Sequence, residues 1–209
     1  MYKKKFFFLV FEGIEGTGKS FQIKKLYNSL IKAKYSVIKT REPGGSKTAE
    51  VIRKLIFSKN SNKFDKITDY FLMNAARNEH IKKSLTTAKK EKKIVISDRF
   101  IDSTYAYQVK GKGIDEGINK IIQNYIVKDL KPDLTIVLKS GLSTILKRIN
   151  NRKNNNKFDK LENNFYKKAQ SAFINLAKKN KKKYIVLDSS KNTNELEKII
   201  LKIVLKRIN

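Results

Sequence analysis

Near the N-terminus of the chain, residues Gly13–Ser20 read GIEGTGKS and match the phosphate-binding loop pattern G-x-x-x-x-G-K-[ST]. The run before this segment, Phe6–Phe11, is apolar and aromatic like a buried strand, and apolar residues recur with helical spacing over Phe21–Ala33. Because the pattern requires this order of strand, loop and helix, we interpret the segment as a triphosphate cradle rather than a chance glycine-rich turn.

The loop offers a polyphosphate several kinds of contact. Gly13, Gly16 and Gly18 let the backbone curl so that successive N–H groups face the phosphates, and the start of the next helix adds positive charge. We expect Lys19 to bring its ammonium to the transferred phosphate and the Ser20 hydroxyl to bind a magnesium ion. The predicted triphosphate-binding segment is therefore the whole loop: Gly13, Ile14, Glu15, Gly16, Thr17, Gly18, Lys19 and Ser20.

Composition limits the classes of protein to which the chain can belong. Its 209 residues, 40% of them hydrophobic, are enough for one domain with a substantial core, and we predict a single domain over 1–209. No apolar run reaches the length of about 18 residues that a membrane span needs, so we expect no membrane partner. The chain has no cysteine, which excludes disulfides and fits a cytoplasmic protein. It has a single histidine, His80, whereas an HExxH zinc site needs two, so that site is excluded.

The charge of the chain is strongly positive, with 48 Lys+Arg against 19 Asp+Glu and a net charge of +29. Such an excess can indicate a polyanionic partner, and a nucleic-acid-binding ATPase is the function that it suggests. However, the lysines are spread over every segment together with many Asn and Ile residues. We therefore favour a drift in composition with lysines on solvated surfaces, and we expect no specific nucleic acid partner.

Short strand-like runs alternate with longer helical segments along the chain. Strands are predicted at Phe6–Phe11, Tyr35–Thr40, Ile94–Ser97, Leu134–Leu138 and Tyr184–Leu187. Helices are predicted at Lys19–Lys34, Thr48–Phe57, Thr68–Lys92, Asp115–Asp129, Ser143–Asn150, Leu161–Lys179 and Asn194–Arg207, with Thr68 and Ser143 as N-caps. The alternation predicts an α/β fold, a parallel sheet with helices on both faces, whose ligands bind at the carboxyl ends of the strands.

Two motifs follow the second and third predicted strands and should lie beside the loop. Ile94–Arg99 reads IVISDR, in which Asp98 would help to hold magnesium and Arg99 would grip a second phosphate group. Arg41–Gly45 reads REPGG, a turn that presents charged side chains at a strand end. Each motif alone has a plainer explanation, a helix cap for Asp98 and a surface turn for REPGG.

Three other segments carry groups suited to a nucleotide. Ala75–Arg77 (AAR) allows a close approach to a helix and adds a cation, and Ser103–Gln108 (STYAYQ) supplies hydroxyls, an amide and rings for a nucleobase and its sugar. Arg148 and Arg152 lie in or beside a basic, Asn-rich segment that could close over a polyphosphate. The alternatives are a solvated arginine, tyrosines that only pack the helix, and a solvated basic loop.

In combination, these motifs resemble the thymidylate (dTMP) kinase family. FEGIEGTGKS, TREPGG, AAR, SDRFIDSTYAYQ, KPDLTIVL and the basic segment before DKLE span Phe11 to about Glu162 in the order and spacing of that family. The resemblance implies a P-loop NTPase fold with a five-stranded parallel sheet, helices on both faces and a short lid at about 148–160. It also implies transfer of the ATP γ-phosphate to dTMP in dTTP biosynthesis, Mg²⁺, and usually a homodimer.

The resemblance also implies roles for individual residues. Lys19, Arg99 and Arg152 would be catalytic, with Arg152 as the lid arginine of the bacterial type, and Ser20 and Asp98 would serve magnesium. The substrate-binding set would be Glu15, Arg41, Pro43, Phe71, Met73, Arg77, Arg99, Thr104, Tyr107 and Gln108.

Within that set, the resemblance assigns each part of the acceptor to different side chains. Glu15 would meet the 3′-hydroxyl of the sugar, and Tyr107 would pack against the sugar and disfavour a 2′-hydroxyl. Thr104 and Gln108 would help to read thymine.

The chain departs from the family pattern at three places. Met73, with Phe71 nearby, stands where many members carry a ring that stacks on thymine. Lys139 replaces a frequent acid, and Asp159-Lys160 replaces an Asp-Arg pair in the lid. These departures leave open a second possibility, a nucleoside monophosphate kinase with an altered base preference.

Overall fold

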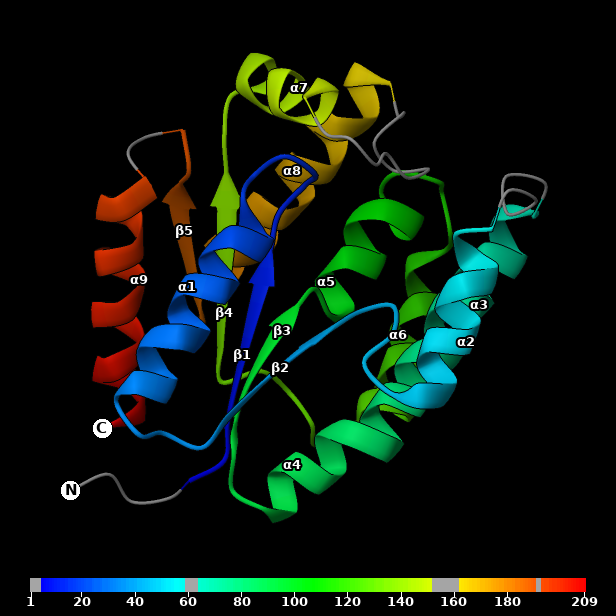
Figure 1. The fold of residues 1–209 in the computed structure, drawn as a ribbon. Helices are drawn as coiled ribbons and strands as arrows, with labels where there is room; N and C mark the ends of the chain where they lie inside the picture. The colour runs from blue at the N-terminus through cyan, green and yellow to red at the C-terminus, as the bar shows by residue number, and fades with distance from the viewer. Residues whose placement is uncertain (1–4, 59–63, 152–161, 191–192) are drawn as a thin grey trace.

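The computed structural model describes residues 5–58, 64–151, 162–190 and 193–209, which form a parallel sheet between layers of helices (Figure 1). The strands are β1 (Phe7–Glu12), β2 (Val37–Arg41), β3 (Ile94–Asp98), β4 (Leu134–Lys139) and β5 (Tyr184–Asp188). They lie in the order β2-β3-β1-β4-β5, and every neighbouring pair is parallel. The predicted α/β class and the predicted parallel sheet are confirmed.

Each strand continues one residue further than its apolar run predicted. The added residues are all polar: Glu12, Arg41, Asp98, Lys139 and Asp188. They still pair with a neighbouring strand, as Arg41 and Asp98 do, and so do Lys139 and Asp188. A search for apolar runs stops before them because they project from the carboxyl edge of the sheet, where polar side chains serve function rather than the core.

The helical segments alternate with the strands as predicted, with differences at their ends. They are α1 (Lys19–Lys32), α2 (Lys47–Ile56), α3 (Lys66–His80), η2 (Ile81–Leu85), α4 (Thr86–Lys90), α5 (Ile101–Thr104), η3 (Tyr105–Val109), α6 (Glu116–Val127), α7 (Leu142–Asn150), α8 (Asn163–Lys179) and α9 (Thr193–Ile208). The segments η2 and η3 are π-helical. The helical segment made by α5 and η3 is absent from the predicted helices.

The two predicted N-caps are wrong. Helix α3 is capped by Asp65, whose carboxylate accepts a hydrogen bond from the Ile67 N–H at 2.7 Å, three residues before Thr68. Helix α7 begins after Gly141, ahead of Ser143, with no side-chain cap.

The helices form one layer on each face of the sheet. Helices α1 and α9 cover one face, where Leu26 and Ile200 pack with Leu9 of β1 (Figure 1). On the other face, Phe8 of β1 packs with Leu85 of η2, and α6 and α8 complete that layer. Strand β1 is buried along its whole length, which explains why the sequence shows a continuous apolar run there rather than an alternation.

Candidate active site

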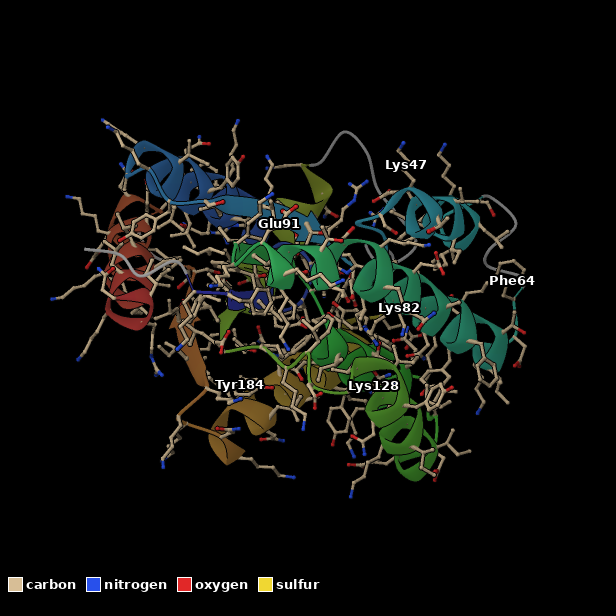
Figure 2. All side chains as sticks on the ribbon, turned by 90° about the horizontal axis from the view of Figure 1, so that it is seen from below. Lys47, Phe64, Lys82, Glu91, Lys128 and Tyr184 are labelled. Carbon is tan, nitrogen blue, oxygen red and sulfur yellow. The ribbon has the colours of Figure 1, made fainter. Side chains whose placement is uncertain are left out.

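A cavity of about 230 Å³ opens at the carboxyl ends of β1, β2 and β3. Figure 2 views the molecule from the opposite edge, where Glu91, Lys128 and Tyr184 mark the connections into β3, β4 and β5. Twelve of the predicted site residues line the cavity: Glu15, Lys19, Ser20, Arg41, Pro43, Met73, Arg77, Asp98, Arg99, Thr104, Tyr107 and Gln108. The fold therefore brings together segments that lie far apart in the sequence.

The phosphate loop connects β1 to α1 and is shaped largely by its own backbone. Gly18 has a left-handed φ of 83° where α1 begins, and a Cβ on Gly13 would lie 2.2 Å from the Leu138 oxygen. The Lys19 ammonium donates to the carbonyl oxygens of Gly13 at 2.8 Å and Ile14 at 2.9 Å. Burial, with Arg99 adding to it, lowers the pKa of Lys19 to about 8.

The two predicted magnesium ligands lie in contact at the mouth of the loop. The Ser20 hydroxyl donates to Asp98 Oδ2 at 2.9 Å, and both residues line the cavity. Asp98 does not cap α5, whose N-cap is Phe100, so the helix-cap explanation fails. Hydroxyl and carboxylate oxygens are the ligands that Mg²⁺ prefers, and it usually takes its remaining ligands from water and phosphate oxygens. The pair fits that ion.

No denser metal site competes with this pair in the part of the chain that the structure describes. Residues 5–58, 64–151, 162–190 and 193–209 contain no group of three or more His, Cys, Asp and Glu side chains that could hold a metal ion. In the same residues, no helix has both the length and the apolar character that a membrane crossing requires.

Arg99, Glu15 and Tyr107 form a charged cluster that links the phosphate loop to α5 and η3. The Arg99 guanidinium donates to Glu15 Oε1 at 2.6 Å and to the Gly13 oxygen at 3.1 Å, and the Tyr107 hydroxyl donates to Glu15 Oε2. Burial raises the pKa of Tyr107 well above its usual value, so the phenol keeps its proton. The loop carboxylate therefore faces residues that came from two other motifs.

A second cluster joins the REPGG turn to α3. Glu42 accepts from Arg77 Nε at 2.7 Å and lies 2.9 Å from His80 Nδ1, and all three side chains are buried. Burial alone would raise the pKa of Glu42, but Arg77 and His80 outweigh it and hold the pKa below its usual value. Arg77 is thus a buried cation beside the cavity, which excludes the solvated arginine and leaves REPGG as more than a surface turn.

Uncharged side chains line another part of the cavity wall. Met73 of α3 is buried at the cavity wall, with Thr104 and Gln108 of the α5–η3 segment also lining it. Tyr107 lines the cavity and also packs on Phe165 with 5.8 Å between ring centroids, so helix packing is not its only contact.

Several predicted residues lie elsewhere or differ in their contacts. Phe71 is 53% exposed and does not line the cavity, so the structure does not bring it to the site. Arg41 lines the cavity, and its guanidinium donates two hydrogen bonds to the Glu50 carboxylate, at 2.8 and 3.1 Å. Arg148 donates to the Gly16 oxygen at 3.2 Å and is no solvated loop residue. Arg152, with most of the predicted lid, lies outside the described residues.

The cavity is also lined by five residues outside the predicted set of site residues. These are Glu42, Arg53, Phe57, Phe100 and Ser103. Glu42, Phe100 and Ser103 lie inside the predicted motifs, and their places in those motifs could have identified them. Arg53 and Phe57 lie in or beside α2, where Arg53 donates to the Pro43 oxygen at 2.7 Å and stacks on the Phe57 ring. No local pattern marks that pair.

Comparisons with known proteins show which family the chain is similar to. The family model described as thymidylate kinase matches residues 11–200. The thymidylate kinase of Mycoplasma capricolum is 36% identical over 203 residues, which cover 96% of this chain and 95% of that protein. The thymidylate kinase of a Sulfurihydrogenibium species is 38% identical over 195 residues, with coverages of 93% and 95%. The crystal structure of thymidylate kinase from Ehrlichia chaffeensis has a TM-score of 0.77 at 30% identity and covers 96% of this chain and 99% of its own.

Proposed function

This chain belongs to the thymidylate kinase family and phosphorylates dTMP, and we propose that it does so with ATP and Mg²⁺ in the cavity described above. The observation that carries the proposal is the contact of Glu15 with Arg99 and Tyr107. Glu15 belongs to the loop that would hold the donor, whereas Arg99 and Tyr107 line the space for the acceptor. A single carboxylate thus lies where the two substrates would meet.

On the donor side, we assign the phosphates of ATP to the loop residues Gly13–Ser20. Lys19 now donates to two loop carbonyls, and it would exchange these for phosphate oxygens when ATP binds. Ser20 and Asp98 would hold Mg²⁺, which would neutralise charge on the phosphates. Arg152 is our choice for the lid arginine that stabilises charge on the transferred group.

On the acceptor side, Arg99 would bind the dTMP phosphate and Arg77 the region of the base. Tyr107 would contact the sugar, and Thr104 and Gln108 would face thymine. The acceptor phosphate is already an anion, so these residues need only to hold it in line and to exclude water, and no general base is required. The cavity wall carries the cations Lys19, Arg77 and Arg99 that this task requires.

An assay of ADP release with dTMP, dUMP, dCMP, dGMP and UMP as acceptors tests the proposal. We expect the largest kcat/KM with dTMP and no turnover when EDTA removes Mg²⁺. A preference for a purine would overturn the proposed acceptor site. The second candidate, an altered base preference, is favoured by Met73, which occupies the cavity wall where a stacking ring is common. It predicts comparable turnover of dTMP and another pyrimidine nucleotide.

We also propose that the protein is a homodimer. Exposed apolar side chains occur on three neighbouring helices: Val51 and Leu55 of α2, Ile67 and Phe71 of α3, and Ile118, Ile121 and Tyr125 of α6. Helix α3 packs against both α2 and α6, so these side chains belong to one side of the molecule (Figure 1). Sedimentation equilibrium should give the mass of a dimer, and a monomer would refute this part. The cytoplasmic location and the single domain stay predictions.

A further inference from the structure

Glu12, the last residue of β1, is fully buried and lies directly before the phosphate loop. Its side chain does not line the cavity and so cannot touch a bound substrate there. Instead it reaches the connection from β3 to α5. Its Oε1 accepts from the Phe100 N–H at 2.9 Å and the Ser103 N–H at 3.2 Å, and its Oε2 accepts from the Ser103 hydroxyl at 2.7 Å.

These contacts compensate for what α5 lacks at its own start. The residue at its N-cap position is Phe100, which provides no side-chain hydrogen bond. The first N–H groups of a helix have no partner within the helix, and burying them unpaired costs free energy. Glu12 accepts from the Phe100 N–H, from a strand that ends 88 residues earlier in the sequence, and it shares the Ser103 N–H with the Phe100 carbonyl oxygen. The carboxyl group therefore fixes the place where α5 begins.

The same carboxyl group reaches Arg99 through one hydroxyl. Ser103 Oγ donates to Glu12 and accepts from the Arg99 guanidinium at 3.0 Å, while Arg99 also donates to Glu15. Arg99 has a left-handed φ of 76°, a backbone conformation that a non-glycine residue keeps only when its surroundings hold it. Glu12 bonds to Phe100 and Ser103, which follow Arg99 in the chain, and so supports the C-terminal side of this backbone.

We infer that Glu12 is a positioning residue for the acceptor: through Ser103 and the Phe100 amide, it holds Arg99 in the geometry that receives the dTMP phosphate. The inference rests on the proposed role of Arg99. It gives no role to Glu12 in ATP binding, because the Lys19 and Ser20 side chains contact other partners. Loss of Glu12 should therefore affect the two substrates unequally, whereas general damage to the fold would affect both.

The neutral isostere is an informative variant because Glu12 is held in an environment that favours the uncharged form. Burial, and then the nearby Asp102, raise the pKa of Glu12 to about 8. Glutamine would keep an oxygen for the two amides and a polar group beside Ser103, whereas leucine would keep only the volume. Asp69 provides a matched control, since it is buried and bound to Lys112 at 2.8 Å but does not line the cavity.

The experiment measures KM for dTMP and for ATP in the wild type and in Glu12→Leu, Glu12→Gln and Asp69→Leu. We expect Glu12→Leu to raise the dTMP KM by about tenfold or more, the scale of one misplaced hydrogen bond to a charged group, with the ATP KM within about twofold. Glu12→Gln should recover most of the loss, and Asp69→Leu should show no such split. Equal rises in both KM values, or the same split in Asp69→Leu, would overturn the inference.

Ser103→Ala keeps the inference testable if Glu12→Leu fails to fold. This variant removes the hydroxyl between Glu12 and Arg99 but leaves the two amide contacts in place. It should raise the dTMP KM by about threefold or more and leave the ATP KM unchanged. An unchanged dTMP KM would refute the connection. A wild-type enzyme without ATP-dependent turnover of dTMP would instead refute the proposed function.

Discussion

The phosphate loop and the acceptor side of the cavity are constructed in different ways. Inside the loop, two side chains bond to near neighbours: Lys19 to Gly13 six residues away, and Thr17 to Ile14 three residues away. On the acceptor side, hydrogen bonds join residues 35 apart in Arg77–Glu42 and 92 apart in Tyr107–Glu15. The internal contacts of the loop thus lie within a short stretch of sequence, and Arg99, Arg148 and Asp98 add contacts from other elements. The side of the cavity that we assign to the acceptor depends on such distant contacts alone in these two pairs.

This difference predicts how substitutions will behave. A loop residue such as Lys19 contacts the carbonyl oxygens of Gly13 and Ile14, which also accept from Arg99 and Thr17. The loss of Lys19 should therefore affect turnover rather than folding. An acceptor-side residue such as Glu42 neutralises a buried cation, so its loss should affect folding as well. Measurements of stability and of turnover on the same variants can separate the two cases.

The largest effect is expected for Glu42→Ala, on stability. It leaves the buried Arg77 without its carboxylate, and breaking a buried pair in this way costs about 3–5 kcal/mol. Urea unfolding measures the free energy. Glu116→Ala breaks the exposed pair with Lys110 and is the matched control, with an expected loss within about 0.5 kcal/mol. Similar losses in both variants would mean that the acceptor side does not depend on its buried charges.

The next effect is expected for Lys19→Ala, on turnover. Loss of one electrostatic stabiliser of the transferred phosphate should lower kcat by ~10²-fold or more. The free energy of unfolding should not fall, because the substitution also removes a buried cation whose pKa burial has lowered. Steady-state kinetics and urea unfolding of the same preparation check both statements. A stability loss as large as that of Glu42→Ala would abolish the contrast between the two regions.

The same contrast explains what the sequence could predict. One short pattern predicts the phosphate loop together with the strand before it and the helix after it. The other motifs come directly after predicted strands, and the carboxyl ends of parallel strands share one edge of the sheet, so the position of these motifs at that edge was predictable. Asp98 and Ser20 meet because β1 and β3 are neighbours in register, with Phe11 opposite Asp98. The predicted parallel sheet was sufficient to place both residues at one edge, whereas the pairing of β1 with β3 that brings them into contact comes from the structure.

The partners on the acceptor side could not be predicted in this way. Arg77 had two explanations by spacing alone, and only its burial against Glu42 decides between them. Phe71 and Met73 lie two residues apart on α3, so a helix turns them to different sides, and the structure places Met73 at the cavity and Phe71 on the surface. Glu12 has no motif signal for its role, since its partners lie about 90 residues away.

Glu15 tests where one region ends and the other begins, because it lies in the loop but binds Arg99 and Tyr107. Glu15→Gln removes the negative charge that would face the acceptor sugar and leaves the loop backbone, which would hold ATP, unchanged. We expect the dTMP KM to rise about tenfold and the ATP KM to stay within about twofold, as for loss of one hydrogen bond to a charged group. Binding of each nucleotide, measured by calorimetry, should show the same split. Equal losses for both nucleotides would mean that Glu15 only shapes the loop, and the cavity would then lack the contact that joins its donor and acceptor sides.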